Sequence, residues 1–256
     1  MASDRGGLFD LHGDTALITG AGSGIGARMA WALARAGAHT LLVGRRAERL
    51  QATADRILNA GAPRARVVTA DLSAVADWPR FVAQHQLDSV DVVCNVAGIN
   101  LRQHADDVTG ADWDRTLNLN LKVPFFLAQA LVTTMRQRGW GRIINIASLQ
   151  TQRAFPGGIA YGAAKGAIPQ LTRAMAEAWS AHGINANAIA PGFFPTELTQ
   201  PVFDDPQRAA RNAAQTAVGR NGELPDLDGV TVFFASRASD YVTGQTLYLD
   251  GGFTAK

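Results

Sequence analysis

The 256-residue chain has very little cysteine and no long apolar run, and both absences narrow its class. Cys94 is the single cysteine, so no disulfide can form within the chain and a cysteine-based metal site is not expected. The five histidines are dispersed without a His-x-x-x-His pair, and we expect no bound metal. No apolar run approaches the roughly 18 residues of a membrane helix, and the N-terminus lacks a signal core. We therefore expect a cytoplasmic protein that does not associate with membranes.

Charged side chains are also sparse, at 18% of the residues, and the formal net charge is only +2. Arginine is scattered rather than clustered, so the basic stripe typical of nucleic-acid-binding proteins is missing and no nucleic-acid partner is expected. A hydrophobic content of 47% is typical of a globular protein with a large core. Because no linker or change of composition divides the chain, we predict a single domain over residues 1–256.

Short apolar runs alternate with helical patterns along most of the chain. The predicted strands cover residues 15–19, 39–46, 66–72, 90–98, 142–148, 184–190 and 246–250. The predicted helices cover residues 28–38, 47–60, 77–86, 112–138, 161–182 and 225–236. We expect a break at Pro124, a bend at Pro169, a polar lead-in over 1–13 and an irregular polar segment over 195–222. The alternation predicts an α/β fold, a parallel sheet with helices on both faces.

A glycine-rich turn joins the first predicted strand to the first predicted helix. It reads G-A-G-S-G-I-G from Gly20 to Gly26, with the spacing G-x-x-x-G-x-G. A strand, a glycine turn and a helix together place a helix N-terminus where it can bind a phosphate group. The alternative is an ordinary βα turn, but the strand and helix on either side favour a dinucleotide site.

Three polar side chains follow the fifth predicted strand. Tyr161 and Lys165 stand four apart, so on a helix they share one face, and Ser148 closes the preceding strand. A phenol with a pKa of about 10 is a poor acid or base at neutral pH, and a neighbouring cation favours its ionised form. The three residues therefore form a plausible proton-transfer device. Taken alone, Tyr161 and Lys165 are equally compatible with an exposed helical pair.

Six separated motifs extend this interpretation: T-G-A-G-S-G-I-G at 19–26, N-V-A-G at 95–98, N-L-K-V from Asn120, Ser148 with Y-G-A-A-K at 161–165, P-G-F-F-P-T at 191–196, and a D-G-G ending. With them the chain resembles the short-chain dehydrogenase/reductase family over essentially its whole length. The resemblance implies a Rossmann-like, doubly wound parallel sheet of about seven strands and hydride transfer with a nicotinamide dinucleotide. The family commonly has N-N-A-G where this chain has Val96, which removes one polar side chain and keeps Asn95.

By matching position, the resemblance implies a role for each of four catalytic residues. Tyr161 is the general acid in carbonyl reduction and the general base in alcohol oxidation. Lys165 holds the nicotinamide ribose and keeps the phenol near its working pKa. Ser148 hydrogen-bonds the substrate oxygen as charge develops on it. Asn120 holds a water that connects Lys165 to solvent, or alternatively only bonds its own helix.

The resemblance also implies two sets of binding residues. The expected cofactor contacts are Gly20, Ser23, Gly24, Ile25, Gly26, Arg45, Asp71, Leu72, Asn95, Ala97, Gly98, Tyr161, Lys165, Pro191, Gly192 and Thr196. The expected substrate wall is Ser148, Gln150, Arg153, Tyr161, Phe193 and Phe194. Phe193 and Phe194 are equally compatible with a core position under a lid. The dinucleotide-binding part is expected at about 13–150 and the substrate lid at about 192–222.

The reaction expected from this resemblance interconverts a secondary alcohol and a ketone without metal. A-S-L-Q after the fifth strand and A-P-G-F-F-P-T-E-L after the sixth are similar to gluconate 5-dehydrogenase and related enzymes. We therefore expect a sugar acid, a polyol or a small ketone as the substrate. The alternative is a 3-oxoacyl-carrier-protein reductase, but Thr133 and Glu177 stand where such enzymes tend to carry docking arginines. A non-catalytic dinucleotide-binding redox sensor is the alternative from another class.

The resemblance also implies a homotetramer. One dimer face would use the helices at 112–138 and 161–182, and the final strand would lie near a second symmetric face.

The end of the second predicted strand indicates the cofactor. A carboxylate at this position selects NAD, but the family's acidic position falls at Gly44. Arg45 follows, and its planar guanidinium suits a phosphate. Arg46 either helps to bind the phosphate or faces solvent, and we favour solvent. Asp71 is expected to contact the adenine. We therefore favour NADP(H) over NAD(H), with stacking of Arg45 on the adenine as the competing interpretation.

We predict that Arg45→Ala weakens NADPH binding by on the order of 10-fold or more, because a charge-assisted hydrogen bond to phosphate is lost. NADH, which has no 2′-phosphate, should be affected far less, and Gly44→Asp should shift the preference toward NAD. Steady-state KM values for both cofactors check this. An equal loss for the two cofactors in Arg45→Ala would show that this side chain does not recognise the phosphate.

Overall fold

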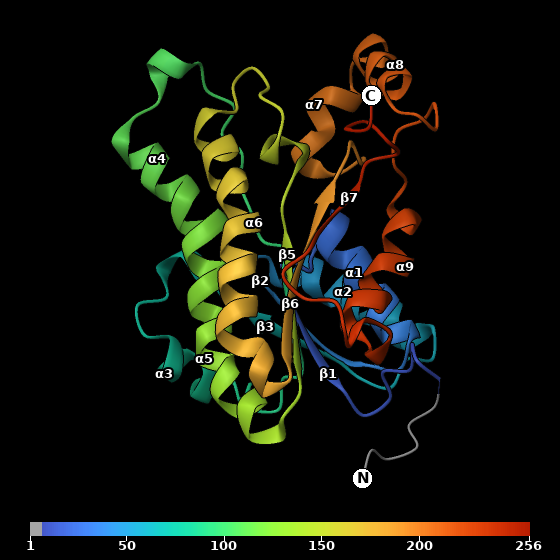
Figure 1. Ribbon diagram of the computed structural model, residues 1–256. Coiled ribbons are helices and arrows are strands. Elements are labelled where there is room, and N and C mark those ends of the chain that lie inside the picture. The colour runs from blue at the N-terminus through green and yellow to red at the C-terminus, as the bar shows by residue number, and fades with distance from the viewer. Residues whose placement is uncertain (1–6) are drawn as a thin grey trace.

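A computed structural model describes residues 7–256; residues 1–6, part of the predicted lead-in, lie outside the described range. Seven parallel strands form one sheet in the order β3-β2-β1-β4-β5-β6-β7 (Figure 1). Their bounds are β1 Thr15–Thr19, β2 His39–Gly44, β3 Ala65–Thr69, β4 Val92–Asn95, β5 Gly141–Ile146, β6 Ile184–Pro191 and β7 Thr246–Leu249. The order reverses between β1 and β4, which makes the sheet doubly wound as predicted.

Helices cover both faces of the sheet (Figure 1). On one face lie α1 Gly24–Arg35, α2 Ala47–Asn59 and α9 Leu227–Ala235. On the other lie α3 Trp78–Gln84, α4 Gly110–Leu117, α5 Val123–Arg138 and α6 Ile159–Trp179. The short helices α7 Gln200–Phe203 and α8 Pro206–Gln215 stand above the sheet, at the top of the molecule in Figure 1. Within residues 7–256 no helix combines the length and apolar composition needed to cross a bilayer.

The strands contribute side chains to two separate core layers, because successive side chains of a strand point to opposite faces of the sheet. In β1, Leu17 packs among residues of α3, α5 and α6, whereas Ala16 and Ile18 pack among residues of α1, α2 and α9. Both faces of the central strands are therefore apolar, as expected for a parallel sheet covered on both sides.

The segment 195–222 is not irregular, as the sequence pattern suggested, but largely helical. A 3₁₀ turn at Glu197–Thr199 leads into α7 and then α8. Local signals explain the start of α8: Asp205 accepts a hydrogen bond from the backbone N–H of Arg208, and Pro206 occupies the first turn. Alanine, the best helix former, fills much of the rest of α8.

Two prolines interrupt helical hydrogen bonding beside the future site. The predicted break at Pro124 takes the form of a π-helical turn, Asn118–Lys122, directly before α5. Pro124 carries no N–H and so cannot donate to the carbonyl of Asn120, four residues earlier. Pro169 lies inside α6, which continues through it. Pro169 likewise leaves the carbonyl of Lys165 without its helical donor, and the hydroxyl of Thr151 donates to that carbonyl instead, at 3.3 Å.

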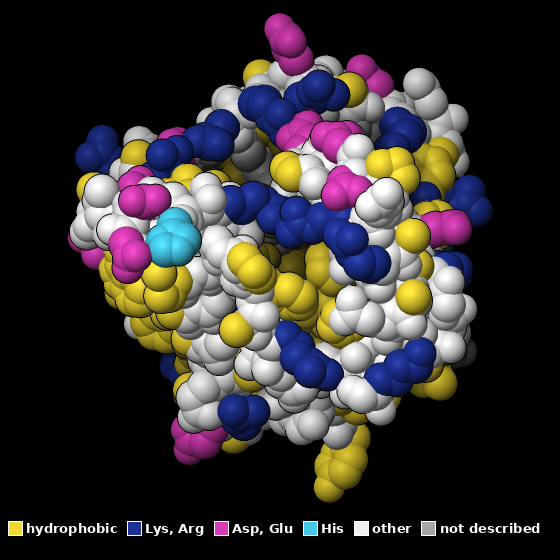
Figure 2. Space-filling model, turned by 90° about the horizontal axis from the view of Figure 1, so that it is seen from above, with side chains coloured by type: hydrophobic (Ala, Val, Ile, Leu, Met, Phe, Trp, Pro, Cys, Tyr) yellow, Lys and Arg dark blue, Asp and Glu magenta, His cyan; other side chains and the backbone are white. Residues whose placement is uncertain are grey.

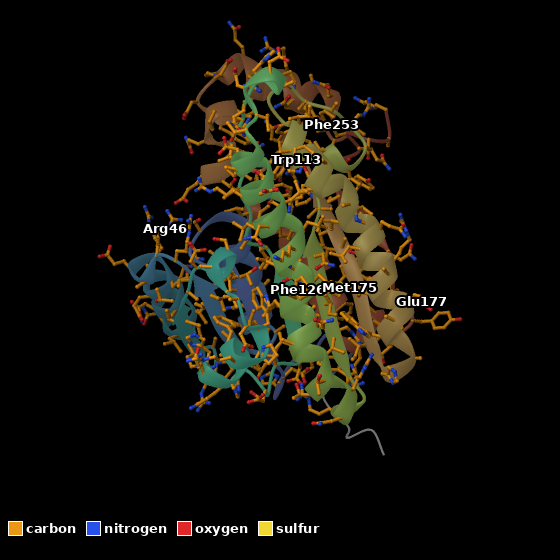
Figure 3. All side chains as sticks on the ribbon, turned by 90° about the vertical axis from the view of Figure 1, so that its left-hand side faces the viewer. Arg46, Trp113, Phe126, Met175, Glu177 and Phe253 are labelled. Carbon is orange, nitrogen blue, oxygen red and sulfur yellow. The ribbon has the colours of Figure 1, made fainter. Side chains whose placement is uncertain are left out.

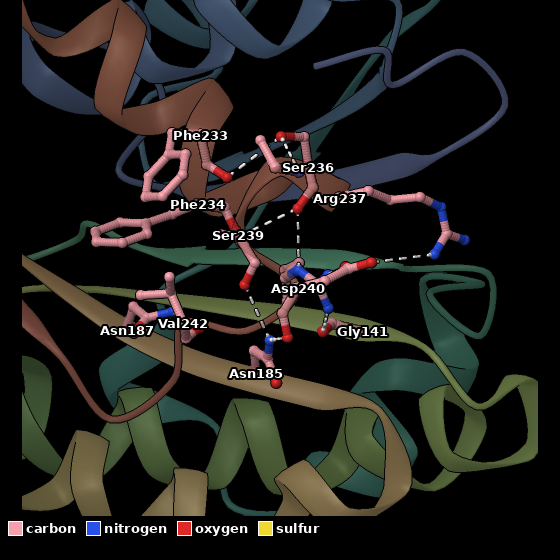
Figure 4. Close-up of polar contacts among 12 residues, drawn as sticks. Gly141, Asn185, Asn187, Phe233, Phe234, Ser236, Arg237, Ser239, Asp240 and Val242 are labelled. Carbon is pink, nitrogen blue, oxygen red and sulfur yellow. Dashed lines mark hydrogen bonds and ion pairs between the residues drawn. The ribbon is translucent and has the colours of Figure 1, made fainter. Parts of the chain in front are cut away.

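A buried arginine organises the end of the sheet opposite the carboxyl ends of the strands. Arg142 of β5 is 2% exposed, donates to the carbonyl of Ser236, and forms an ion pair with Asp240. The amide of Asn185 donates to the carbonyls of Ser239 and Asp240, at 3.2 and 2.9 Å (Figure 4). These bonds attach the segment between α9 and β7 to the sheet.

We predict that Asp240→Ala lowers the free energy of unfolding by about 1–3 kcal/mol, because it removes the ion-pair partner of the buried Arg142 guanidinium. The corresponding fall in Tm is several degrees for a chain of this length. Thermal unfolding followed by circular dichroism measures it. Asp106→Ala is the matched control, since that side chain is 89% exposed. Equal Tm values for the two variants would contradict the role assigned to the ion pair.

Candidate active site

A cavity of about 770 Å³ lies at the carboxyl ends of the strands, where an open α/β sheet binds ligands. Seen from above, basic side chains gather around a hollow whose floor is hydrophobic (Figure 2). The walls come from the ends of β1, β2, β4, β5 and β6, from the start of α1 and α6, and from the segment carrying α7 and α8. The cavity therefore joins the predicted dinucleotide-binding part to the predicted lid.

The glycine turn at one end of the cavity is packed too closely for side chains. A Cβ on Gly26 would lie 2.3 Å from the carbonyl oxygen of Gly20, and one on Gly20 would lie 3.0 Å from the Cα of Ala97. Gly20 and Gly24 also have φ values of +68° and +51°, which favour glycine. The turn thus brings bare backbone and the N-terminus of α1 to the cavity wall. This arrangement fits the pyrophosphate of a dinucleotide.

A hydroxyl keeps this turn beside the next strand. The backbone N–H groups of Val96 and Ala97 donate to the Thr19 hydroxyl oxygen at 2.9 and 3.0 Å. The same hydroxyl donates to the carbonyl of Cys94 at 3.3 Å. Val96 takes part through its backbone and packs its side chain against the core, so its departure from the family pattern leaves the turn intact.

Arg46 is exposed, as favoured from the sequence, and its side chain also has partners. Its guanidinium donates to both carboxylate oxygens of Glu197, at 3.2 and 2.7 Å, and to the hydroxyl of Ser23. Arg46 lies at the outer edge of the molecule in Figure 3, and Glu197 belongs to the lid segment. This ion pair spans the groove, and the strand pattern alone could not predict it. Arg45 and Gly44 line the cavity beside it, as expected.

Asp71 and Leu72 also line this end of the cavity. The Asp71 carboxylate accepts hydrogen bonds from the backbone and hydroxyl of Ser73, at 3.0 and 2.6 Å. The Ser73 hydrogen bonds chiefly hold the pKa of Asp71 below its ordinary value, with smaller effects from the charges of Arg45 and Arg115. The predicted contact of Asp71 with adenine stays a prediction.

Ser148 and Tyr161 meet in the middle of the cavity, one from the turn after β5 and one from the first turn of α6. The Ser148 side chain acts on the phenol of Tyr161 and lowers its pKa. The hydroxyl of Ser148 also accepts from the backbone N–H of Gln150 at 3.1 Å, which fixes its position. A phenol and a hydroxyl held together in this way can hydrogen-bond one substrate oxygen and exchange a proton with it.

Lys165 lies one helical turn beyond Tyr161 and is 4% exposed. Its ammonium donates to the carbonyl of Ile146 at 2.6 Å and stands 5.7 Å from the centre of the Tyr161 ring. An ammonium has three N–H donors, and within residues 7–256 this carbonyl is its hydrogen-bond acceptor. Donors remain for the hydroxyls of a ribose.

Asn120 is buried in the π-helical turn beside Lys165. Its amide donates to the carbonyls of Ile99 and Thr116, both at 2.9 Å, and accepts from the N–H of Ile99 at 3.3 Å. The side chain is thus committed to backbone, including that of its own helix. The predicted water-holding role stays a prediction. The group that would hold the water is the backbone carbonyl of Asn120, to which Pro124 cannot donate a hydrogen bond.

The pKa values of this group differ from the sequence expectation. Burial raises the pKa of Tyr161 above its ordinary value, while the hydrogen bond from Ser148 and the charge of Arg102 oppose this. Burial also lowers the pKa of Lys165 to about 8. That Lys165 keeps the phenol near its working pKa stays a prediction. Desolvation outweighs the charges, and the cation that acts on the phenol is Arg102.

Two of the predicted site residues lie away from the cavity wall. Asn95 is buried at the end of β4, where its amide donates to Asn145 at 2.8 Å and ties β4 to β5. Arg153 instead donates to the C-terminal carbonyl of Lys256 at 3.1 Å. All other predicted cofactor and substrate residues line the cavity.

The aromatic part of the predicted substrate wall is larger than expected. Phe193 packs edge-on against both Phe155 and Phe253, at ring-centre distances of 5.7 and 5.8 Å. Phe155 lines the cavity, and the buried Phe253 packs behind it from the C-terminal segment. Phe194 is only 2% exposed and fills space under the lid, close to the core position considered from the sequence. Gln150 stands at the wall with a buried side-chain oxygen that has no partner within the described residues.

The sequence analysis missed Arg102, which lines the cavity beside Tyr161. Its backbone has a φ of +53°, a conformation that is uncommon outside glycine and often marks a functional site. Its guanidinium donates to the carbonyl of Leu198 in the lid segment at 2.8 Å. Its position just beyond N-V-A-G, at the carboxyl edge of the sheet, was a signal that could have identified it.

The lid helix α8 was the second omission. Arg208, Arg211, Asn212 and Gln215 line the cavity, and their spacing is i, i+3, i+4 and i+7. That spacing puts four polar side chains on one face of a helix. The pattern is visible in the sequence, but it was lost because the whole segment was assigned as irregular.

Known proteins with this arrangement identify the family. A profile described as enoyl-(acyl carrier protein) reductase matches residues 20–254. A gluconate 5-dehydrogenase of Gluconobacter oxydans (strain 621H) is 39% identical over 249 residues, which cover 96% of this chain and 97% of the relative. The chain belongs to the short-chain dehydrogenase/reductase family.

Two further similarities support this membership. A 2-dehydro-3-deoxy-D-gluconate 5-dehydrogenase of Bacillus subtilis (strain 168) is 40% identical over 257 residues, with 97% of each chain covered. The crystal structure of a gluconate 5-dehydrogenase from Burkholderia cenocepacia J2315, in complex with NADP and tartrate, has a TM-score of 0.91. It is 38% identical, with 100% of each chain covered. The predicted family, Rossmann-like fold and enzyme class, a short-chain dehydrogenase using NAD(P), are confirmed.

We predict that Arg102→Gln shifts the pH profile of alcohol oxidation to higher pH. In the role predicted for Tyr161, its phenolate is the base in oxidation, and the Arg102 charge lowers the pKa of that phenol. Without the charge this pKa rises further, so the phenolate forms at higher pH. Initial oxidation rates from pH 7 to 11 measure the shift. Arg80→Gln, at an exposed position on α3, is the control. An unchanged or lowered midpoint in Arg102→Gln would contradict the assignment.

Proposed function

We propose that the protein is an NADP(H)-dependent oxidoreductase that interconverts a secondary hydroxyl and a keto group on a sugar acid. One observation carries the proposal: Ser148, Tyr161 and Lys165 line one cavity, and Arg102 lines it beside them. Binding of a dinucleotide requires neither the serine nor the phenol. An acid–base group beside a cation is suited to chemistry on an anionic alcohol or ketone.

Each residue of the group has a separate task in this reaction. When bound, the nicotinamide supplies or accepts the hydride. Tyr161 gives a proton to the carbonyl oxygen during reduction and removes one from the hydroxyl during oxidation. Ser148 hydrogen-bonds the same oxygen and stabilises the charge that develops on it. Lys165 binds the ribose hydroxyls. It also passes protons between Tyr161 and the water that Asn120 is predicted to hold. A raised pKa keeps Tyr161 protonated at neutral pH, ready for reduction.

NADP(H) is the cofactor. Gly44 offers no carboxylate to repel a 2′-phosphate, and a Cβ there would meet only the Leu50 side chain at 3.4 Å. Arg45 and Arg46 flank the same end of the cavity. The bound NADP in the similar Burkholderia enzyme supports this choice. A 2′-phosphate reaching Arg46 would share it with Glu197, the carboxylate that the guanidinium contacts here.

A sugar acid is the substrate class because arginine and amide side chains line the substrate side of the cavity opposite its aromatic wall. Arg102 is positioned to bind the carboxylate while a hydroxyl of the same molecule reaches Tyr161. The side-chain amides of α8, Asn212 and Gln215, are suited to the remaining hydroxyls. The names of the relatives from Gluconobacter and Bacillus support this class. The carrier-protein alternative is not favoured, since Thr133 and Glu177 are exposed and offer no cationic docking surface.

The finer features of the prediction belong to the same proposal. We treat residues 1–256 as one domain that acts in the cytoplasm as a homotetramer. Apolar side chains on the face formed by α4, α5 and α6 support assembly, including Trp113, which is 37% exposed, and the half-buried Phe126 (Figure 3). Burying such side chains against a symmetric copy stabilises an oligomer. The lid covers about 192–222.

We predict that Tyr161→Phe lowers kcat for sugar-acid oxidation by on the order of 100-fold or more, because the transferable proton is lost. The ring remains, so NADPH binding should change little. NADPH formation with D-gluconate and 2-dehydro-3-deoxy-D-gluconate, together with a fluorescence titration of NADPH, provides the test. Tyr248→Phe, the matched control outside the cavity lining, should keep its turnover.

Three outcomes would contradict the proposal. Full turnover by Tyr161→Phe would remove the acid–base assignment. Clear preference for an acyl-carrier thioester over sugar acids would favour the carrier-protein reductase. NADPH binding without turnover of any carbonyl or alcohol would favour the redox sensor.

A further inference from the structure

The charges that line the cavity are divided unevenly between its two halves. At the cofactor end, the carboxylates of Glu197 and Asp71 accompany the arginines. Glu197 pairs with Arg46 at 2.7 Å, and Asp71 is affected by the charge of Arg45. At the substrate end, the lining contains three arginines, Arg102, Arg208 and Arg211, and no carboxylate among the described residues.

The two arginines of α8 have no partner of their own within residues 7–256. Neither guanidinium forms an ion pair or a hydrogen bond with a described residue, whereas Arg28, Arg46, Arg142 and Arg220 are each paired with a carboxylate. Arg102 differs from both sets, because it is held by the carbonyl of Leu198. Arg208 and Arg211 stand one helical turn apart on the cavity face of α8 and can approach one anion together.

The three arginines also carry more positive charge than one carboxylate neutralises. Partial burial lowers the pKa of Arg102 from its ordinary value, and the nearby charge of Arg208 lowers it further. Like charges gathered around a cavity repel one another, and anions bound between them remove that repulsion. A monoanion held by Arg102 leaves Arg208 and Arg211 unneutralised.

We propose that Arg208 and Arg211 form a second anion-binding subsite on the lid, and that the preferred substrates are sugar acids with two anionic groups. The inference rests on the proposed sugar-acid function and deepens it. Arg102 binds the carboxylate next to the reacting end, and the α8 pair binds the second anionic group. That group is either a second carboxylate, as in an aldaric acid, or a phosphate ester, since guanidinium binds both in the same bidentate way.

Kinetics with three acids test the proposal: D-gluconate with one charged group, D-glucarate with two carboxylates, and 6-phospho-D-gluconate with a carboxylate and a phosphate. Each is assayed with NADP⁺ as a substrate and as a competitive inhibitor of D-gluconate oxidation, so an acid that binds without reacting is still measured. At least one dianion should bind on the order of 10-fold more tightly than D-gluconate. The stronger of the two dianions identifies the second group.

Arg208→Gln and Arg211→Gln should remove this advantage. Each should weaken the favoured dianion by on the order of 10-fold, through KM or Ki rather than kcat, since the subsite binds ground and transition states alike. The KM for D-gluconate should change by less than about threefold. The Kd for NADPH should stay the same in both variants. The control Arg80→Gln should change neither the binding of the dianion nor the binding of NADPH. In the unmodified enzyme, rising salt should weaken the binding of the dianion more than the binding of D-gluconate.

Several results would overturn the subsite while leaving the proposed function intact. One is equal binding of all three acids with D-gluconate turned over normally. Another is equal weakening of monoanion and dianion in the α8 variants. A third is weaker NADPH binding in those variants, which would make Arg208 and Arg211 cofactor ligands. Failure of every sugar acid to bind or react would instead reject the proposed function and the subsite together.

Discussion

The active cavity depends on how the ends of β1 and β4 are held together at the point where the strand order reverses. The Thr19 hydroxyl makes this connection, accepting from two N–H groups of the β4 turn and donating to the carbonyl of Cys94. The contact lets Gly20 approach Ala97 so closely that no side chain fits between them. The N-terminus of α1 and the start of the catalytic region are thereby fixed relative to each other. The binding groove follows from this local packing.

The catalytic centre shows a second constraint, since polar groups are buried only where the backbone can satisfy them. Pro169 removes a helical donor from the carbonyl of Lys165, and Thr151 replaces it. The ammonium of Lys165 is in turn held by the carbonyl of Ile146, so burial costs it part of its basicity without leaving it unpaired. Desolvation and hydrogen bonding thus set the protonation states here more strongly than the spacing of charges along the helix.

The sequence was informative where function depends on local pattern and weak where it depends on distant contacts. Periodicity and glycine spacing predicted the parallel sheet, the phosphate-binding turn, and the positions of Ser148, Tyr161 and Lys165. The ion pair of Arg46 with Glu197 joins residues 151 apart, and no local pattern indicates it. Asn95 shares the N-V-A-G motif, yet its side chain lies on the face covered by α5, where its amide donates to Asn145 and to the carbonyl of Pro124. The polar residues of α8 recur at helical spacing in the sequence, and they were missed only because the helix was not recognised.

The central claim is that the cavity supports direct hydride transfer between a sugar acid and the nicotinamide, with the protein moving only the proton. Isotope transfer tests it most directly. D-Gluconate deuterated at the carbon on which the keto group forms is oxidised with NADP⁺ in ordinary water, and the products are analysed by NMR and mass spectrometry. The account predicts one deuterium at C4 of the reduced nicotinamide and none released to solvent. Deuterium found in water, or reduced cofactor formed without the label, would contradict it.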